Sequence, residues 1–136
     1  MNPSVSLVGN RVELRVVLTA PDFDDAVAFY RDALGLEQLA DWSGEDGRVI
    51  LLDAGHATIE LFDERQAEHV DRIEAGHRVS GPTRLAFAVD DLDGTAERLL
   101  AAGAEAEAEP VVPPWGGRNA RLRTTDGMQL TLFSES

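Results

Sequence analysis

The chain has 136 residues, of which 43% are hydrophobic and 27% are charged, as expected for one globular domain with its own core. It contains no cysteine, which excludes disulfides, thiolate catalysis and cysteine-ligated zinc. Its formal net charge of −13 argues against nucleic acid as a partner, because the phosphates would be repelled. With no basic, apolar leader and no apolar run of about 18 residues, we expect a cytoplasmic protein without a membrane partner.

The first half of the chain begins with a predicted strand. Residues 12–20 alternate between polar and apolar side chains, and this alternation places Arg15 on the polar face. A helix is expected to begin near Asp22, which can cap its first turn, and to end at about Leu34 before Gly35. Three further strands are then predicted, at 36–42, 47–53 and 57–63.

A polar segment separates the first half from a second unit of the same kind. Residues 64–81 lack strand alternation and are interpreted as a connector, in which a short helix can begin near Asp63. The second unit is predicted to contain a strand at 83–90, a helix at 91–102, a weak strand at 105–109, and strands at 118–124 and 128–134.

The two halves also match each other in sequence. The segment from Leu14 to Asp24 aligns with the segment from Thr83 to Asp93, so that Arg15 falls on Arg84. Duplicated units stack so that each buries the apolar face of the other, which would bring these two arginines together near a pseudo-twofold axis. We therefore predict one α+β domain, 1–136, made of β-α-β-β-β repeats at about 11–63 and 82–135 that are joined by residues 64–81.

Three segments of the chain resemble the vicinal oxygen chelate superfamily in their order and spacing: residues 20–36, 85–93 and 126–133. That group includes glyoxalase I, bleomycin-resistance proteins, extradiol dioxygenases, fosfomycin-resistance enzymes and methylmalonyl-CoA epimerase. The resemblance spans nearly the whole chain and implies two βαβββ modules whose curved sheets form a cup-shaped, incomplete barrel. Members commonly pair or swap modules, so a homodimer is expected. A shared fold does not select a function.

The resemblance also implies four inward positions that hold the metal in metal-dependent members. Carried onto this chain, these positions are Arg15, Glu60, Arg84 and Thr131, of which only Glu60 is a metal-ligand type. A guanidinium has no lone pair to donate and repels a cation. We therefore expect no metal and no other cofactor.

Arg15, Glu60 and Arg84 allow two interpretations. In the first, Glu60 pairs with the arginines in an internal ion pair that fills the metal position. In the second, the excess positive charge attracts an anionic or hydrogen-bond-accepting ligand. Arg121 and Arg123 share one face of a late strand. That face is either the cup, where the two arginines would add further donors, or a solvated face, and the solvated face is favoured.

Two tryptophans lie in predicted loops and also have two interpretations. Trp42 and Trp115 either form stacking surfaces at the mouth of the cup or pack at an edge or dimer contact. Phe62 and Phe133 share strand parity with Glu60 and Thr131 and are predicted to line the lower cup. None of the three histidines falls on a ligand position, and each is expected to be solvated: His56, His69 and His77.

The sequence favours a metal-independent protein of the bleomycin-resistance type, which binds a small natural product or drug. Its predicted ligand-binding residues are Arg15, Glu60, Arg84, Trp115, Thr131 and Trp42. The alternative is a glyoxalase- or dioxygenase-like lyase or isomerase, in one of two versions. In the first, no metal is needed and Glu60 would be the catalytic base. A carboxylate held by two arginines would have a lowered pKa, which weighs against that role. The second is a metalloenzyme, which the loss of metal ligands disfavours. A third possibility is a structural or regulatory dimer with a filled cup.

Overall fold

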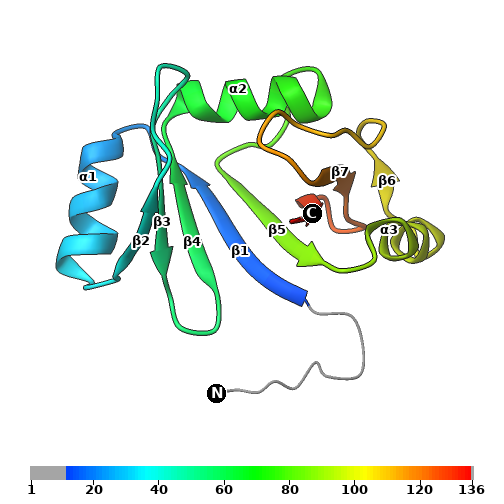
Figure 1. Ribbon diagram of the computed structural model, residues 1–136, viewed down its shortest axis with the longest axis horizontal. Coiled ribbons are helices and arrows are strands. Elements are labelled where there is room, and N and C mark those ends of the chain that lie inside the picture. Colours follow the sequence, from blue (N-terminus) through cyan, green and yellow to red (C-terminus); the bar gives the residue numbers. More distant parts are fainter. Residues whose placement is uncertain (1–11, 136) are drawn as a thin grey trace.

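The computed structural model describes residues 12–135, and all eight strands found there belong to one sheet. The strand order is β2-β3-β4-β1-β5-β8-β7-β6, so β1–β4 form one half of the sheet and β5–β8 the other (Figure 1). Three α-helices and a π-helical segment complete this part of the chain. The predicted α+β class and the two βαβββ units are therefore confirmed.

The first half follows the predicted order closely. Strand β1 (Val12–Thr19) leads into α1 (Phe23–Val27), which continues as the π-helical segment η2 (Ala28–Ala33). The Asp22 side chain caps α1 by accepting a hydrogen bond from the Asp25 backbone N–H at 3.0 Å. Three antiparallel neighbours follow: β2 (Gln38–Asp41), β3 (Val49–Asp53) and β4 (Thr58–Phe62).

The connector contains a longer helix than the sequence indicated. Helix α2 spans Glu64–Ala75, is capped at its start by Asp63, and ends at Gly76 in the left-handed conformation. The second half then contains β5 (Thr83–Val89), α3 (Leu92–Ala101), β6 (Glu105–Ala106), β7 (Arg118–Arg123) and β8 (Gln129–Ser134).

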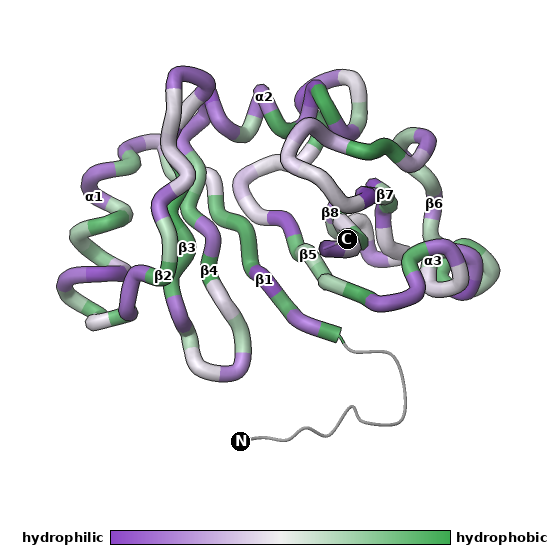
Figure 2. Tube along the Cα trace, in the orientation of Figure 1, coloured by the Kyte–Doolittle hydropathy of each residue, from purple (hydrophilic) through white to green (hydrophobic). Residues whose placement is uncertain are grey.

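The two halves join within one chain through their first strands. Strand β1 pairs in parallel with β4 and in antiparallel with β5, and β5 pairs in parallel with β8. Hydrophobic and hydrophilic positions alternate over the first part of β1, and its later part, Val16–Leu18, is continuously hydrophobic (Figure 2). Module pairing, which the sequence left open, is therefore intramolecular in this structure.

Helices cover both faces of the sheet, but in different places. Helix α1 packs Phe23 and Val27 on one face of the first half, and α3 packs Leu92 on the same face of the second half. Helix α2 packs Ala67 and Val70 on the opposite, concave face (Figure 1). No helix among residues 12–135 is long and apolar enough to cross a membrane. The concave face beyond α2 is left open.

Candidate functional site

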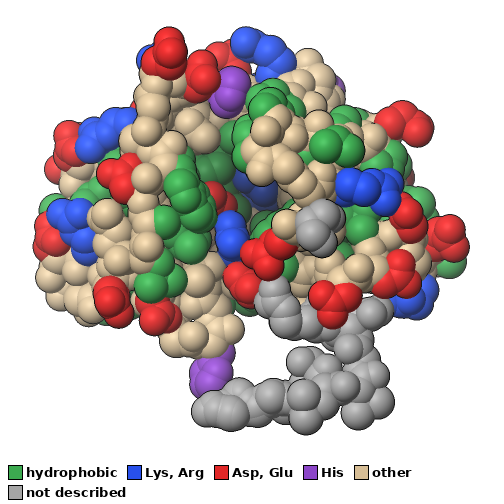
Figure 3. Space-filling view, viewed as in Figure 1, with side chains coloured by type: hydrophobic (Ala, Val, Ile, Leu, Met, Phe, Trp, Pro, Cys, Tyr) green, Lys and Arg blue, Asp and Glu red, His purple; other side chains and the backbone are tan. Residues whose placement is uncertain are grey.

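A cavity of about 560 Å³ lies on the concave face between the two halves. We call it the cup cavity. Figure 3 shows the molecule hollowed between its two halves, with basic and hydrophobic side chains in and around the hollow. The side chains that line it include Arg15, Trp42, Val49, Glu60, Phe62, Gln66, Val70, Glu74, Arg84, Ala86, Trp115, Asn119, Thr131 and Phe133.

Strand register brings the four sequence-predicted inward positions to this cavity. Val17 on β1 is the Cα partner of Glu60 on β4 and also of Arg84 on β5. Arg15 lies two residues before Val17 on β1, and its Cα partner on β5 is Ala86. The Cα partner of Ala86 on β8 is Thr131. Because side chains two residues apart share a face, all of these side chains lie on the concave face. Val17 itself is only 2% exposed and packs in the core cluster with Phe62 and Ala86.

Arg84 is buried in the floor and has little of its hydrogen-bonding capacity satisfied. It is 5% exposed, its Nη1 donates to Thr131 Oγ1 at 2.7 Å, and its guanidinium carbon lies 5.7 Å from the centre of the Phe62 ring. The buried Nε has no acceptor, and no carboxylate among residues 12–135 lies within 4.0 Å of it. Burial and the charge of Arg121 lower the pKa of Arg84 to about 10, although more distant carboxylates oppose this.

Arg15 lies nearer the mouth of the cavity and is held by different groups. Its Nε is 3.6 Å from Glu13 Oε2, and its Nη2 is 3.8 Å from Glu135 Oε2. Its guanidinium also lies over two rings, 4.9 Å from the centre of Phe133 and 5.8 Å from the centre of Trp42. Arg15 is therefore fixed by rim carboxylates and aromatic side chains.

Glu60 does not form the internal ion pair that one interpretation expected. Within the described part of the chain, its carboxylate has no hydrogen bond and no cation within 4.0 Å. Burial raises the pKa of Glu60, and the charges of Arg84 and then Arg15 oppose the rise without cancelling it. The expected lowering of this pKa was wrong, because both guanidiniums are too far away to outweigh the loss of hydration.

The solvated face that was favoured for Arg121 is wrong, and the alternative, the cup face, is the one on which Arg121 lies. Arg121 is 1% exposed, and its Nε and Nη2 donate at 2.7 Å to Glu74 and Asp71, both on α2. Arg123 lies at the exposed edge of β7 and pairs with Glu107 at 2.9 Å. The strand parity was right, since both arginines share the concave face. The helix that covers Arg121 was the missing information.

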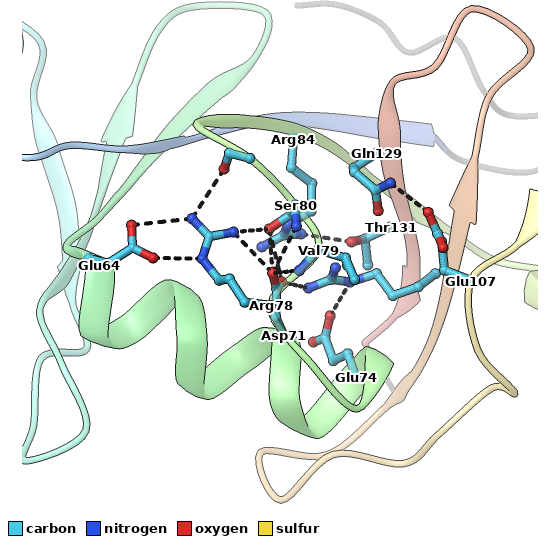
Figure 4. A network of polar contacts seen from close by, with 12 residues as sticks. Glu64, Asp71, Glu74, Arg78, Val79, Ser80, Arg84, Glu107, Gln129 and Thr131 are labelled. Carbon is cyan, nitrogen blue, oxygen red and sulfur yellow. Dashed lines mark hydrogen bonds and ion pairs between the residues drawn. The ribbon is translucent and has the colours of Figure 1, made fainter.

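Asp71 is the centre of a buried polar network (Figure 4). It accepts hydrogen bonds from Arg121, from Arg78 Nη1 at 3.1 Å, and from the Val79 and Ser80 N–H groups at 2.9 Å. Burial alone would raise the pKa of Asp71, but the Arg121 charge and these N–H donors lower it to about 2. The network ties α2 to β7 and to the segment that precedes β5. Gln66, Val70 and Glu74 of the same helix line the cup cavity.

Three polar residues of this cavity were not predicted from the sequence. Glu74 accepts from Asn119 Nδ2 at 2.6 Å, and Gln66 and Asn119 both line the cavity. The spacing of Ala67, Val70, Asp71 and Glu74 puts them on one face of a helix, which is the signal that could have identified α2 as a wall of the site.

Both tryptophans lie at the rim of the cavity. Trp42 is 51% exposed and Trp115 is 54% exposed, so each presents a ring to solvent while lining the opening. Phe62 is buried and Phe133 is partly buried, deeper on the concave face. Aromatic surfaces therefore extend from the opening of the cavity to its floor.

The chain matches a known protein family over most of its length. Residues 14–132 match the model of the Glyoxalase/Bleomycin resistance protein/Dioxygenase superfamily. The chain belongs to this superfamily. A relative within it is the uncharacterized protein YraH of Bacillus subtilis (strain 168), which is 32% identical over 124 residues, covering 88% of this chain and 95% of YraH.

Solved structures of other proteins share the superfamily fold. A hypothetical protein of Bacillus halodurans C-125 has a TM-score of 0.66 at 18% identity, covering 93% of this chain and 95% of that chain. Methylmalonyl-CoA epimerase from Mycobacterium tuberculosis has a TM-score of 0.59 at 20% identity, covering 100% and 93%. At these identities the likeness shows the fold alone.

The residues at the implied metal position of the superfamily do not fit a divalent cation. Two of the four positions are arginines, one is a threonine whose hydroxyl already accepts from Arg84, and one is a single carboxylate. Elsewhere in residues 12–135, no group of three or more histidine, aspartate or glutamate side chains is arranged to hold a metal ion. Arg84 supplies a fixed positive charge on the concave face, where a cation would be repelled.

None of the histidines joins the site. His56 and His77 are exposed, and His69 on α2 lies 3.6 Å from the Asp46 carboxylate and is not among the residues that line the cup cavity.

Proposed function

We propose that the protein binds a small organic molecule in the cup cavity without a metal, in the manner of the bleomycin-resistance members of its superfamily. One observation carries the proposal: the cavity of about 560 Å³ combines aromatic side chains with polar groups that lack partners. Its volume lies within the range of roughly 300–1,000 Å³ that is usual for small-molecule sites. The third possibility, a cup filled by side chains, is not supported by a cavity of this size.

In this proposal, residues at the rim and residues at the floor of the cup cavity contact different parts of the ligand. Trp42 and Trp115 offer rings for stacking at the opening, and Phe133 continues that surface inward. Arg84, Glu60 and Arg15 offer a donor, an acceptor and a cation, respectively, to a polar part of the ligand. Thr131 orients Arg84 by accepting from Nη1. Antibiotic sequestration would follow if the ligand is a drug.

The test is native mass spectrometry combined with elemental analysis of the purified protein, before and after a panel of aromatic antibiotics is added. We expect a mass shift for at least one compound and no stoichiometric transition metal. The shift should be absent from a variant in which Trp115→Ala and Trp42→Ala remove both rim rings. Bound iron, manganese, nickel or zinc at one equivalent would overturn the metal-independent part of the proposal.

A metal-free lyase or isomerase is the second candidate, and the state of Glu60 supports it. A general base for proton abstraction works best with a pKa near the operating pH, and burial raises the pKa of Glu60 in that direction. Arg84 lies on the same concave face and would stabilise an oxyanion. Glu60→Gln separates the candidates, because a binding protein keeps its affinity whereas an enzyme loses turnover.

The homodimer and the cytoplasmic location remain predictions. Light scattering after size-exclusion chromatography checks the first: a mass of about twice the 14.7 kDa of one chain is expected. Fractionation of the source cells checks the second.

A further inference from the structure

Arg84 is a buried cation that the protein leaves mostly unsatisfied. A guanidinium carries five N–H donors, yet the hydrogen bond found for Arg84 within residues 12–135 is the one to the neutral Thr131 hydroxyl. The buried Nε has no acceptor. A buried charge is normally paired, because removing it from water is costly. The floor of the cup cavity is therefore complementary to an acceptor that the described residues do not supply.

The surroundings of Arg84 restrict the chemistry of that acceptor. Phe62 lies 5.7 Å from its guanidinium, and Phe133 lies 4.9 Å from that of Arg15, so aromatic rings flank both cations. Glu60 and Glu74 line the same cavity, and Glu74 is already paired with Arg121. Carboxylates in the walls disfavour a dianion such as a phosphate monoester, whereas a singly charged planar group matches the fork of a guanidinium.

We propose that the cup cavity binds an aromatic carboxylate, whose carboxylate accepts hydrogen bonds from Arg84 while its ring stacks against the aromatic side chains of the cavity. This inference rests on the proposed function and names its ligand class. Arg15 contributes positive charge from the rim side. Glu60 faces the rest of the ligand, where a hydroxyl or amide donor would meet its free carboxylate. The net charge of −13 reduces encounter rates at low salt but is screened beyond about 8 Å at physiological ionic strength.

The test compares three probes that share one ring system and differ in charge: 2-naphthoate, the neutral 2-naphthamide and the cationic 2-naphthylmethylammonium. Isothermal titration calorimetry of the full chain gives a Kd for each probe. We expect 2-naphthoate to bind on the order of 10- to 100-fold more tightly than 2-naphthamide, as for loss of one charge-assisted hydrogen bond. The cationic probe should bind most weakly.

Two arginine variants assign the preference to Arg84. In Arg84→Met the advantage of 2-naphthoate over 2-naphthamide should fall to less than threefold, whereas in Arg48→Met it should be unchanged. Arg48 is the matched control because it pairs with Asp24 at 2.9 Å outside the cup cavity. Circular dichroism confirms folding. If Arg84→Met does not fold, Arg84→Lys replaces it, and loss of the planar fork should weaken 2-naphthoate about tenfold.

The outcomes separate this inference from the proposed function. Equal binding of 2-naphthoate and 2-naphthamide, or an unchanged preference in Arg84→Met, overturns the carboxylate inference and leaves the small-molecule cup intact. Failure of all three probes and of every antibiotic in the panel overturns both. Tight binding of 2-naphthoate that depends on Arg84 supports both.

Discussion

Arg84 and Arg121 lie on the same concave face of the second half of the sheet, and both are almost completely buried. Arg121 donates to two carboxylates at 2.7 Å, whereas Arg84 donates to one neutral hydroxyl at the same distance. Helix α2 supplies both partners of Arg121 and closes that end of the cup cavity. The comparison separates an arginine whose charge is paired with two carboxylates from one that has no carboxylate partner among residues 12–135.

The largest expected effect comes from removing the partnered arginine. Arg121→Met leaves Asp71 and Glu74 buried without their shared cation, and breaking a buried pair in this way costs about 3–5 kcal/mol of unfolding free energy. Urea denaturation monitored by circular dichroism measures the change. Arg123→Met is the control, since its exposed pair with Glu107 should contribute at most about 1 kcal/mol.

A triple variant sharpens this prediction. Asp71→Asn and Glu74→Gln, added to Arg121→Met, neutralise the two carboxylates that lose Arg121 and should recover part of the lost stability, although Asp71 keeps Arg78 as a partner in the single variant. A single Arg121→Met variant as stable as the wild type would show that Arg121 does not support the fold and would remove the basis of the comparison.

The second-largest effect is expected in acid, where protonation of Asp71 should lower the unfolding free energy. The pKa of Asp71 is about 2 in the folded protein and 3.8 in the reference state, so the unfolded chain binds more protons between these values. Stability contributed by Asp71 is therefore fully present above pH 3.8 and is lost as the pH falls toward 2. The difference corresponds to about 2 kcal/mol. Urea midpoints between pH 5 and pH 2 measure it, and Asp71→Asn should flatten this part of the profile.

Removal of Arg84, which has no carboxylate partner among residues 12–135, should not lower the unfolding free energy as removal of Arg121 does. Arg84→Met removes a buried cation that has no carboxylate within 4.0 Å among residues 12–135, at the loss of one hydrogen bond to Thr131. We expect the unfolding free energy to stay within about 1 kcal/mol of the wild type or to rise. The same urea experiment checks this. A loss of 3 kcal/mol or more would mean that Arg84 is structural, as Arg121 is.

Local pattern was sufficient to predict the strands that position the site, but not the role of α2. Strand alternation put Arg15 and Glu60 on the concave face, and the internal repeat put Arg84 on β5, across β1 from Glu60. These features depend on near-neighbour geometry that the sequence carries directly. The match between Arg15 and Arg84 did not extend to their surroundings, since one lies at the rim and the other in the floor.

Burial and pairing could not be predicted in the same way. Arg121 was expected in solvent because nothing local indicates that α2 folds back over β7 to present Asp71 and Glu74. Glu60 was expected beside two arginines, and only the three-dimensional distances show that neither guanidinium reaches it. Such long-range contacts depend on how the connector packs. The helical spacing within residues 64–81 indicates a packing face, but it does not show which strand that face covers.

The smallest predicted effect concerns Glu60, the acceptor that faces Arg84 across the cavity. Burial raises the pKa of Glu60 in the folded state above the reference value of 4.5. Between pH 4.5 and this raised pKa, the folded state therefore binds more protons than the unfolded state. Ionised Glu60 thus costs stability as the pH rises, and the cost disappears below pH 4.5. Glu60→Gln should therefore be slightly more stable than the wild type at pH 7, with the gap closing in acid. Paired urea titrations at pH 7 and pH 4 measure it. A variant less stable than the wild type at pH 7 would mean that Glu60 is a paired structural group, and the cup cavity would lose its free acceptor.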